Sequence, residues 1–223
     1  MPSPESSQSS QKSRLFDGAD ASDASEEERA DPEPPGPPET PQGYRDPVEF
    51  NYPPLWLAVG SFVLFFTAVV GFGWLMGTLR NELVFEFTLG PAGMATVVVA
   101  LGATFVVHEL VHGTVYKLLG YRVSYGVAIN IGALYAAAFG QFQTRRDNVL
   151  CAMAPLAVFT VVLTPLLAGP LPVALLAFFV LVVNTSGAIG DLYITWRLLR
   201  MPPGTLLYDV DARHSYVFYP KRD

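Results

Sequence analysis

The sequence has few cysteines and, beyond its first 50 residues, few acidic side chains. The single cysteine, Cys151, excludes an intramolecular disulfide, and its apolar surroundings (NVLCAMAPLAVF) indicate a packed core thiol. Residues 51–223 contain eight Asp and Glu against ten Lys and Arg, a net charge of +2. The acidic isoelectric point of about 5.0 therefore describes another part of the chain.

The first 50 residues lack the large apolar side chains that a folded core needs. They contain twelve Asp and Glu against four Lys and Arg, a net charge of −8, and they are rich in Ser and Pro. Such a segment cannot bury enough surface to offset its ordering entropy. We therefore expect residues 1–50 to form a disordered, acidic and Pro-rich tail, and residues 51–223 to form the folded domain. No basic region followed by a short apolar run opens the chain, so we expect no signal peptide.

Four apolar segments in the second part are long enough to cross a bilayer as helices. They cover about residues 55–79, 93–119, 149–168 and 171–196, and residues 197–223 follow as a C-terminal tail. A Gly-Pro-Leu-Pro break separates the third segment from the fourth and predicts an antiparallel pair. The pattern predicts a multi-pass integral protein of the cell membrane.

The distribution of Lys and Arg predicts how these segments are oriented. With four spans, only Arg80 falls on one side of the membrane. The basic residues expected on the other side are Lys117, Arg122, Arg145, Arg146, Arg197, Arg200, Arg213, Lys221 and Arg222. Because Lys and Arg are enriched in cytoplasmic loops, we expect both termini in the cytoplasm.

Two segments alternate apolar and polar residues, as strands do. Residues 121–144 predict a β-hairpin on the cytoplasmic side that turns at residues 130–132 and returns to Thr144. Residues 205–219 predict a second, shorter hairpin that turns at residues 211–214. The fold class we expect is an all-α membrane protein with four transmembrane helices, a cytoplasmic β-hairpin and a disordered tail.

The second apolar segment contains the sequence HELVH, an HExxH motif. Residues i and i+4 share one face of a helix, so His108 and His112 can bind the same zinc ion. Glu109 would then act as the general base that deprotonates a zinc-bound water. A carboxylate at membrane depth is costly, which favours a functional interpretation of the motif.

A catalytic zinc ion usually takes three protein ligands, so one more is needed. Asp191 is the only acid in the fourth segment. It lies six residues before Arg197, and His112 lies five residues before Lys117, so both should lie roughly 7.5–9 Å below one membrane boundary. Asp191 is therefore our predicted third ligand. Three alternatives stay open, namely that Asp191 pairs with Arg197, that it caps a local break around Gly187 and Gly190, and that His214 is the ligand.

A second polar residue of the fourth segment, Asn184, lies seven residues before Asp191 and so on the same helical face. Its amide would contact the substrate backbone or a developing oxyanion. An ordinary hydrogen bond between helices explains the residue equally well.

Taken together, HELVHG, Ala154-Pro155 and NTSGAIGDLYI (residues 184–194) resemble the putative zincin peptidase family of membrane proteins. The resemblance covers roughly residues 80–219. The arrangement of these motifs is similar in logic to that of the site-2 protease class. It implies that His108, His112 and Asp191 are ligands and that Glu109 is the base. The chain departs from the site-2 protease pattern because it has no NPxxxxxxxxxDG motif and no room for a PDZ-like domain.

We therefore expect a zinc metalloendopeptidase of the intramembrane type, which hydrolyses peptide bonds in or near the membrane. Its partners would be the lipid bilayer and a membrane protein or membrane-proximal peptide as substrate, and we expect no nucleic-acid partner. Two alternatives are a metal transporter and a catalytically inactive scaffold with the same metal site. A transporter would need polar groups along its path, and the first and third segments offer almost none.

Overall fold

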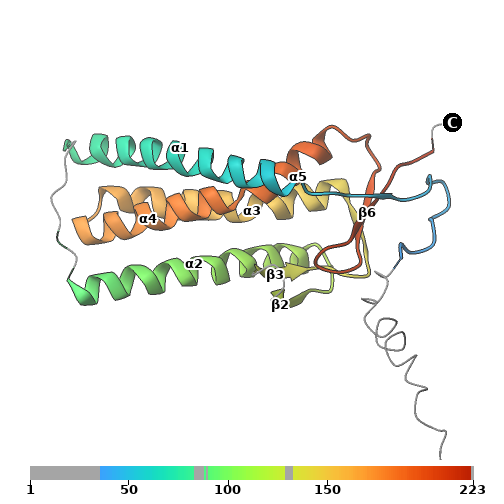
Figure 1. Cartoon of the computed structure of the whole chain (residues 1–223), viewed down its shortest axis with the longest axis horizontal. Helices are drawn as coiled ribbons and strands as arrows, with labels where there is room; N and C mark the ends of the chain where they lie inside the picture. Colours follow the sequence, from blue (N-terminus) through green and yellow to red (C-terminus); the bar gives the residue numbers. More distant parts are fainter. Residues whose placement is uncertain (1–35, 83–87, 89, 129–132, 222–223) are drawn as a thin grey trace, which may run out of the picture. The chain divides into compact units, whose positions relative to one another are not determined.

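The computed structural model describes residues 36–82, 88, 90–128 and 133–221. Five α-helices form most of the described unit, Gly36–Asp223. They are α1 (Pro54–Arg80), α2 (Pro91–Leu118), α3 (Arg145–Leu163), α4 (Leu171–Gly187) and α5 (Ile189–Leu199). A 3-10 turn, η3 (Thr164–Ala168), extends α3. Helices α1 to α4 run along a common direction, and the strands gather at one end of them (Figure 1).

Three of the helical segments are long and apolar enough to cross a membrane. They are Pro54–Arg80, Pro91–Leu118 and Arg145–Ala168, with mean hydropathies of 2.2, 1.9 and 2.2. Most of their side chains face outward, since only 6%, 6% and 22% of the residues in these windows are buried. Apolar side chains that face outward along a whole helix are the surface that a bilayer covers. The chain thus has the features of a membrane protein.

The fourth predicted span differs from the expectation of one continuous helix. Helix α4 stops at Gly187, α5 starts at Ile189, and the two meet at an angle of 45°. They make a fourth span only if the bent pair is counted as one. Glycines at 187 and 190 lower the helix propensity at this point. The break leaves the carbonyl of Ser186 to accept a hydrogen bond from Ser61 Oγ of α1 at 2.8 Å.

The protein is mostly helical, as expected, but it is not all-α, because the described residues also form six strands in two sheets. A four-stranded sheet has the order β1-β6-β5-β4, and a separate pair joins β2 to β3. All pairings are antiparallel. The strands are β1 (Val48–Glu49), β2 (Ser124–Ala128), β3 (Ala133–Ala137), β4 (Phe142–Thr144), β5 (Leu206–Asp209) and β6 (Ser215–Phe218).

Both predicted hairpins are recognisable, with one change. Strands β5 and β6 pair as the second hairpin, from Leu206↔Phe218 to Asp209↔Ser215. Strands β2 and β3 pair from Ser124↔Ala137 to Ala128↔Ala133, and the predicted turn at residues 130–132 lies outside the described residues. The return strand does not run on to Thr144, because residues 142–144 form β4 and pair with β5.

Residues 44–50, which the sequence assigns to the tail, contact the folded domain. Residues 1–35 lie outside the described residues, but β1 pairs with β6, and Tyr44 forms a bridge with Pro220. Phe50 is 2% exposed and packs in one core cluster with Leu198, Leu207 and Val217. This cluster fixes the four-stranded sheet to α5. The segment before α1 therefore belongs to the folded unit.

A second core cluster holds the helices together at the end remote from the sheet. Met76 of α1, Leu167 of η3 and three residues of α4 form it, and Leu167 and Leu181 are fully buried. Between helices in a bilayer, close packing rather than the hydrophobic effect provides most of the attraction. Gly60 of α1 fits this picture, since a Cβ there would lie 2.8 Å from Ile189 Cδ1.

Candidate metal centre

The two histidines of the HExxH motif lie on one face of α2, close to its C-terminal end. One helical turn separates them, and their Nε2 atoms are 3.1 Å apart. His112 is 8% exposed and His108 is partly buried. The helix continues for six residues beyond His112, to Leu118. The pair therefore lies inside the apolar segment, toward the end that carries the strands.

Asp191 reaches the same point from the bent pair of helices. Its carboxylate lies 3.2 Å from His108 Nε2 through Oδ2 and 3.4 Å from His112 Nε2 through Oδ1. The residue belongs to the first turn of α5, where unpaired backbone N–H groups favour a negative charge. The break at residue 188 thus creates a helix start at the depth of the two histidines.

The Nδ1 atoms of both imidazoles are held by neighbouring oxygen atoms. His108 Nδ1 donates to Asn184 Oδ1 at 3.0 Å, and His112 Nδ1 donates to the backbone carbonyl of Cys151 at 2.9 Å. Both rings must carry their proton on Nδ1, because a carbonyl oxygen only accepts. A neutral ring with its proton on Nδ1 has its lone pair on Nε2, and both Nε2 atoms lie next to each other and to Asp191, so both are placed to bind one metal ion. Such outer partners are typical of metal-binding histidines.

The carbonyl that holds His112 is available because of a proline. Pro155 lies inside α3, four residues after Cys151. In a regular helix the N–H of residue 155 would donate to the carbonyl of residue 151, but proline has no N–H. The free carbonyl of Cys151 instead accepts the hydrogen bond from His112 Nδ1. This gives a physical reason for the proline in the Ala154-Pro155 pair.

We expect Pro155→Ala to weaken zinc binding while leaving the chain folded. Alanine restores an N–H that competes with His112 for the carbonyl of Cys151. Loss of an outer-shell partner typically costs about 10–100-fold in metal affinity. Titration of the purified protein with a competing chelator would measure the change. Affinity equal to that of the unchanged protein would contradict this role of the proline.

The donor atoms fit a zinc ion. In a tetrahedral site with bonds of about 2.0–2.2 Å, the ligand atoms lie roughly 3.3–3.6 Å apart. The two Nε2 atoms and the Asp191 oxygens are separated by 3.1, 3.2 and 3.4 Å. When both rings are neutral with the proton on Nδ1, the Nε2 lone pairs and the Asp191 oxygens lie close together, as the ligands of one metal ion do. Two neutral imidazoles and one carboxylate are also a usual set for catalytic zinc.

Glu109 lies beside this cluster. Ligand atoms of His108, Glu109 and His112 fall within 4.8 Å of one another, so the motif alone would also offer a three-atom set. The Asp191 oxygens lie 3.2 and 3.4 Å from the histidine nitrogens, so Asp191 is the other candidate for the third ligand. Glu109 Oε2 instead accepts a hydrogen bond from the backbone N–H of Ala136 in β3 at 2.8 Å. Strand β3 thus fixes the carboxylate next to the two histidines.

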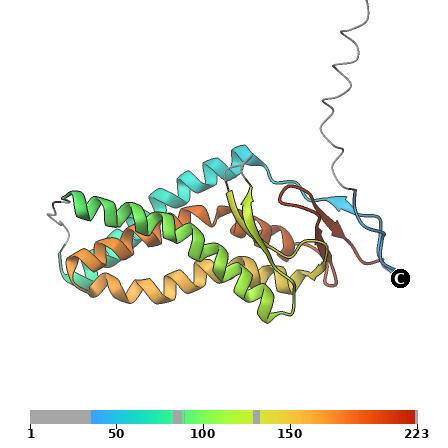
Figure 2. The same ribbon diagram turned by 90° about the horizontal axis from the view of Figure 1, so that it is seen from below.

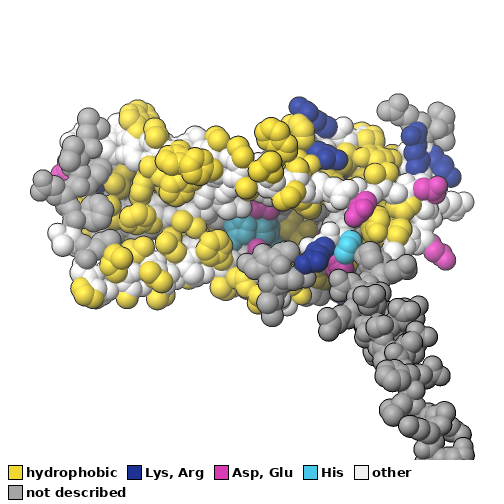
Figure 3. Space-filling model, in the orientation of Figure 1, with side chains coloured by type: hydrophobic (Ala, Val, Ile, Leu, Met, Phe, Trp, Pro, Cys, Tyr) yellow, Lys and Arg dark blue, Asp and Glu magenta, His cyan; other side chains and the backbone are white. Residues whose placement is uncertain are grey.

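Two cavities meet at this cluster. The first has a volume of about 420 Å³ and lies between α2 and α4, where Phe105, Val183 and Gly187 line it together with His108 and Glu109. The second has a volume of about 270 Å³ and extends from the cluster toward the sheet. In the space-filling view, histidine and acidic side chains are visible within a mostly hydrophobic face of the molecule (Figure 3).

The other residues singled out from the sequence have different neighbours. Arg197 donates to Tyr193 Oη at 2.7 Å, and His214 Nδ1 bonds to the Asp211 carboxylate at 2.9 Å. Asn184 is 2% exposed, and its Nδ2 has no partner among the described residues although its oxygen holds His108. Sequence reasoning missed the Ala136 N–H and the Cys151 carbonyl. Only Pro155 signals either of them.

A comparison with known protein families supports a metallopeptidase at a coarse level. Residues 101–206 match the model of a protein family described as "Putative zincin peptidase". The match confirms the resemblance drawn from the motifs and indicates a metallopeptidase with zinc as its metal. No match was found among curated proteins or among solved structures.

Proposed function

We propose that this protein is an integral-membrane zinc metalloendopeptidase that cleaves peptide bonds in or near the bilayer. The observation that carries the proposal is the convergence of His108, His112 and Asp191 beside the Glu109 carboxylate, at the end of an apolar cavity. His108, His112 and Asp191 would hold the metal. A bound zinc ion supplies Lewis-acid polarisation of a peptide carbonyl and lowers the pKa of water.

Glu109 would be the general base of the reaction. One carboxylate oxygen is engaged by the N–H of Ala136, which fixes the direction of the other. That second oxygen would remove a proton from the attacking water and pass it to the leaving amine. A base within the cluster favours an enzyme over an inactive scaffold, since a structural zinc site needs no base.

Asn184 would position both a ligand and the substrate. Its Oδ1 holds His108, the residue lines the apolar cavity, and its buried Nδ2 has no partner among the described residues. A buried donor without a partner is costly, so a bound acceptor would be stabilised there. The carbonyl oxygen of the substrate, which gains negative charge during the reaction, is a suitable acceptor.

Strand β3 offers an edge on which a substrate could unfold. A peptide bond in a membrane helix is shielded by its own hydrogen bonds, so cleavage requires an extended segment. The N–H of Ala136 points to Glu109 and hence away from β2, and Leu134 exposes its backbone to the same edge two residues earlier. Leu134 also lines both cavities. Addition of the substrate as a strand along β3 would present it to the metal ligands.

We expect Glu109→Gln to keep the zinc and to lose cleavage. Glutamine preserves the size of the side chain but cannot accept a proton, so the rate should fall by about 10²–10⁴-fold. Zinc content and cleavage of a membrane-spanning reporter peptide, both measured on protein in nanodiscs, would test this. Retained zinc with full cleavage would exclude Glu109 as the base. Retained zinc without cleavage by the unchanged protein would favour the transporter or the scaffold.

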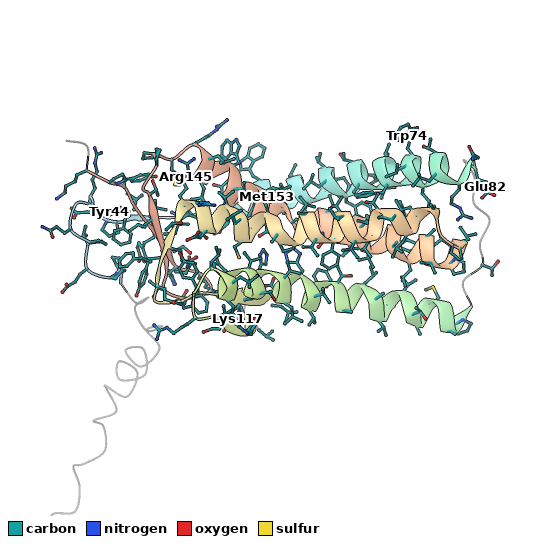
Figure 4. The ribbon with its side chains drawn as sticks, turned by 180° about the vertical axis from the view of Figure 1, so that it is seen from behind. Tyr44, Trp74, Glu82, Lys117, Arg145 and Met153 are labelled. Atoms are coloured by element: carbon teal, nitrogen blue, oxygen red, sulfur yellow. The ribbon has the colours of Figure 1, made fainter. Side chains whose placement is uncertain are left out.

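We also propose that the sheet and both termini are cytoplasmic. Lys117 and Arg145 lie at the end of the helices that carries the sheet, whereas Glu82 lies at the opposite end (Figure 4). In intact cells, an impermeant thiol reagent should reach Pro170→Cys but not Arg146→Cys or Arg213→Cys. All three positions are at least partly exposed and the native Cys151 is buried, so each label reports its own site. The reverse labelling would overturn the orientation.

A further inference from the structure

The cavity on the sheet side of the metal ligands differs in character from the apolar one. It shares Glu109 and Leu134 with the apolar cavity, so the two are adjacent. Its remaining walls come from α3, α5, the sheet and the segment before α1. The polar side chains that line it away from the cluster are Tyr52, Tyr116, Tyr135, Asn148 and Asp209. A substrate held at Glu109 would thus extend into an apolar space on one side and a polar space on the other.

Asp209 is a carboxylate without a positive partner among the described residues around this polar cavity. Gln143 Nε2 and Ser215 Oγ donate to it at 2.8 and 2.6 Å, so its orientation is fixed. In the described part of the chain, no Lys, Arg or His lies within ion-pair distance of it. Burial raises the pKa of the Asp209 carboxyl above its usual value, although these two hydrogen bonds lower it. A cation in the cavity would relieve the cost of burying this charge.

An aromatic side chain stands next to this carboxylate. Burial of the Tyr52 hydroxyl, followed by the charges of Asp209 and Asp191, raises the pKa of Tyr52, so the phenol stays neutral. The ring packs against Phe50 and Tyr193, with centroids 5.0 and 5.8 Å away. A carboxylate beside an aromatic ring is a favourable environment for an ammonium or guanidinium group.

A basic side chain of the protein that lies nearby is directed elsewhere. Arg197 donates to Tyr193 Oη and lies over the Phe50 ring at 5.0 Å. It does not line the polar cavity. The negative charge of Asp209 is therefore left for a ligand rather than used within the described part of the fold.

We propose that the polar cavity is a specificity subsite that binds a Lys or Arg side chain of the substrate, through Asp209 and Tyr52. This inference rests on the proposed function. The cytoplasmic flanks of membrane spans are rich in Lys and Arg. A membrane substrate whose apolar part occupies the space between α2 and α4 would bring such a flank to Asp209. The subsite would thus select the end of the span that is cleaved.

The test measures binding separately from cleavage. The probe is a fluorescent peptide with an apolar segment followed by one arginine, compared with the same peptide carrying citrulline, the neutral isostere of arginine. Binding is measured on the Glu109→Gln protein in zinc-loaded nanodiscs. We expect the citrulline peptide to bind about tenfold more weakly, because a charge-assisted hydrogen bond is lost. Adding Asp209→Asn should remove the difference.

Asp211→Asn is the matched control, because Asp211 lies two residues away, bonds to His214 and does not line the cavity. It should keep the tenfold preference. Equal binding of the two peptides to the protein with Asp209 intact overturns the subsite, and this comparison needs no variant at Asp209. A preference that survives Asp209→Asn overturns it as well. Cleavage of both peptides by the protein with Glu109 intact would then leave the proposed function standing, whereas selective binding without any cleavage would leave only the subsite.

Discussion

Replacement of His108 or His112 by alanine is expected to abolish zinc retention. The unchanged protein should hold about one zinc ion per chain, because two imidazoles and one carboxylate complete the usual catalytic set. With one imidazole gone, only the other histidine and Asp191 remain as protein ligands. The zinc content of purified protein, measured by elemental analysis, should fall from about one to near zero. Cleavage should be lost with it.

His214→Ala is the matched control for both substitutions. It removes the third histidine of the chain, which bonds to Asp211 in the connection between β5 and β6. Zinc content should stay at that of the unchanged protein. Full zinc occupancy in the double variant His108→Ala, His112→Ala would overturn the whole assignment of the site. Loss of zinc in His214→Ala would restore His214 as a ligand.

The parts of this site that are predictable from the sequence are those that depend on local helix geometry. The spacing of His108 and His112 places them on one helical face, and counting residues to Lys117 and Arg197 places Asp191 at a similar depth. The structure brings these three side chains together. That they bind zinc remains a prediction, as does the role of Glu109.

Other features escape the sequence because they depend on contacts between distant segments. The pairing of β1 with β6 joins residues about 170 positions apart, and no local pattern in a two-residue strand indicates it. The hydrogen bond from Ala136 to Glu109 uses a backbone group that every residue except proline carries. The glycines at 187 and 190 indicate where the fourth segment can break, but its apolar length does not predict the bend of 45°, since apolar length measures burial in lipid rather than helix continuity. In Figure 2, strands β2 and β3 lie beside the C-terminal half of α2, so the hairpin completes the site from outside the helices.

Replacement of Asp191 by asparagine is expected to weaken zinc binding by more than the 10–100-fold that is typical of outer-shell partners. The amide has no charge, and its NH₂ group would face the lone pairs of two Nε2 atoms that lie 3.2 and 3.4 Å from the present carboxylate. One ring would then accept a hydrogen bond from the amide instead of binding metal. Asn184→Ala offers a graded comparison, because it removes only the partner of His108 Nδ1 and should stay within the outer-shell range. Chelator competition measures both affinities, and the cleavage assay should show turnover eliminated in Asp191→Asn.

The comparison of Asp191→Asn with Asn184→Ala shows whether Asp191 is a metal ligand or a neighbour that only accepts hydrogen bonds from the histidines. If Asp191 merely accepted protons from the two histidines, asparagine could replace one of these contacts, and zinc affinity would fall no further than in Asn184→Ala. Thiol labelling of Pro170→Cys in the Asp191→Asn background should match that of the protein with Asp191, which shows that the spans are still inserted. With insertion intact, unchanged zinc content and unchanged cleavage would exclude Asp191 as the third ligand. Glu109 would then be the remaining carboxylate within reach of both histidines among the described residues. Glu109 Oε2 accepts a hydrogen bond from the N–H of Ala136 at 2.8 Å. This hydrogen bond would have to break if Glu109 bound the metal through the same oxygen.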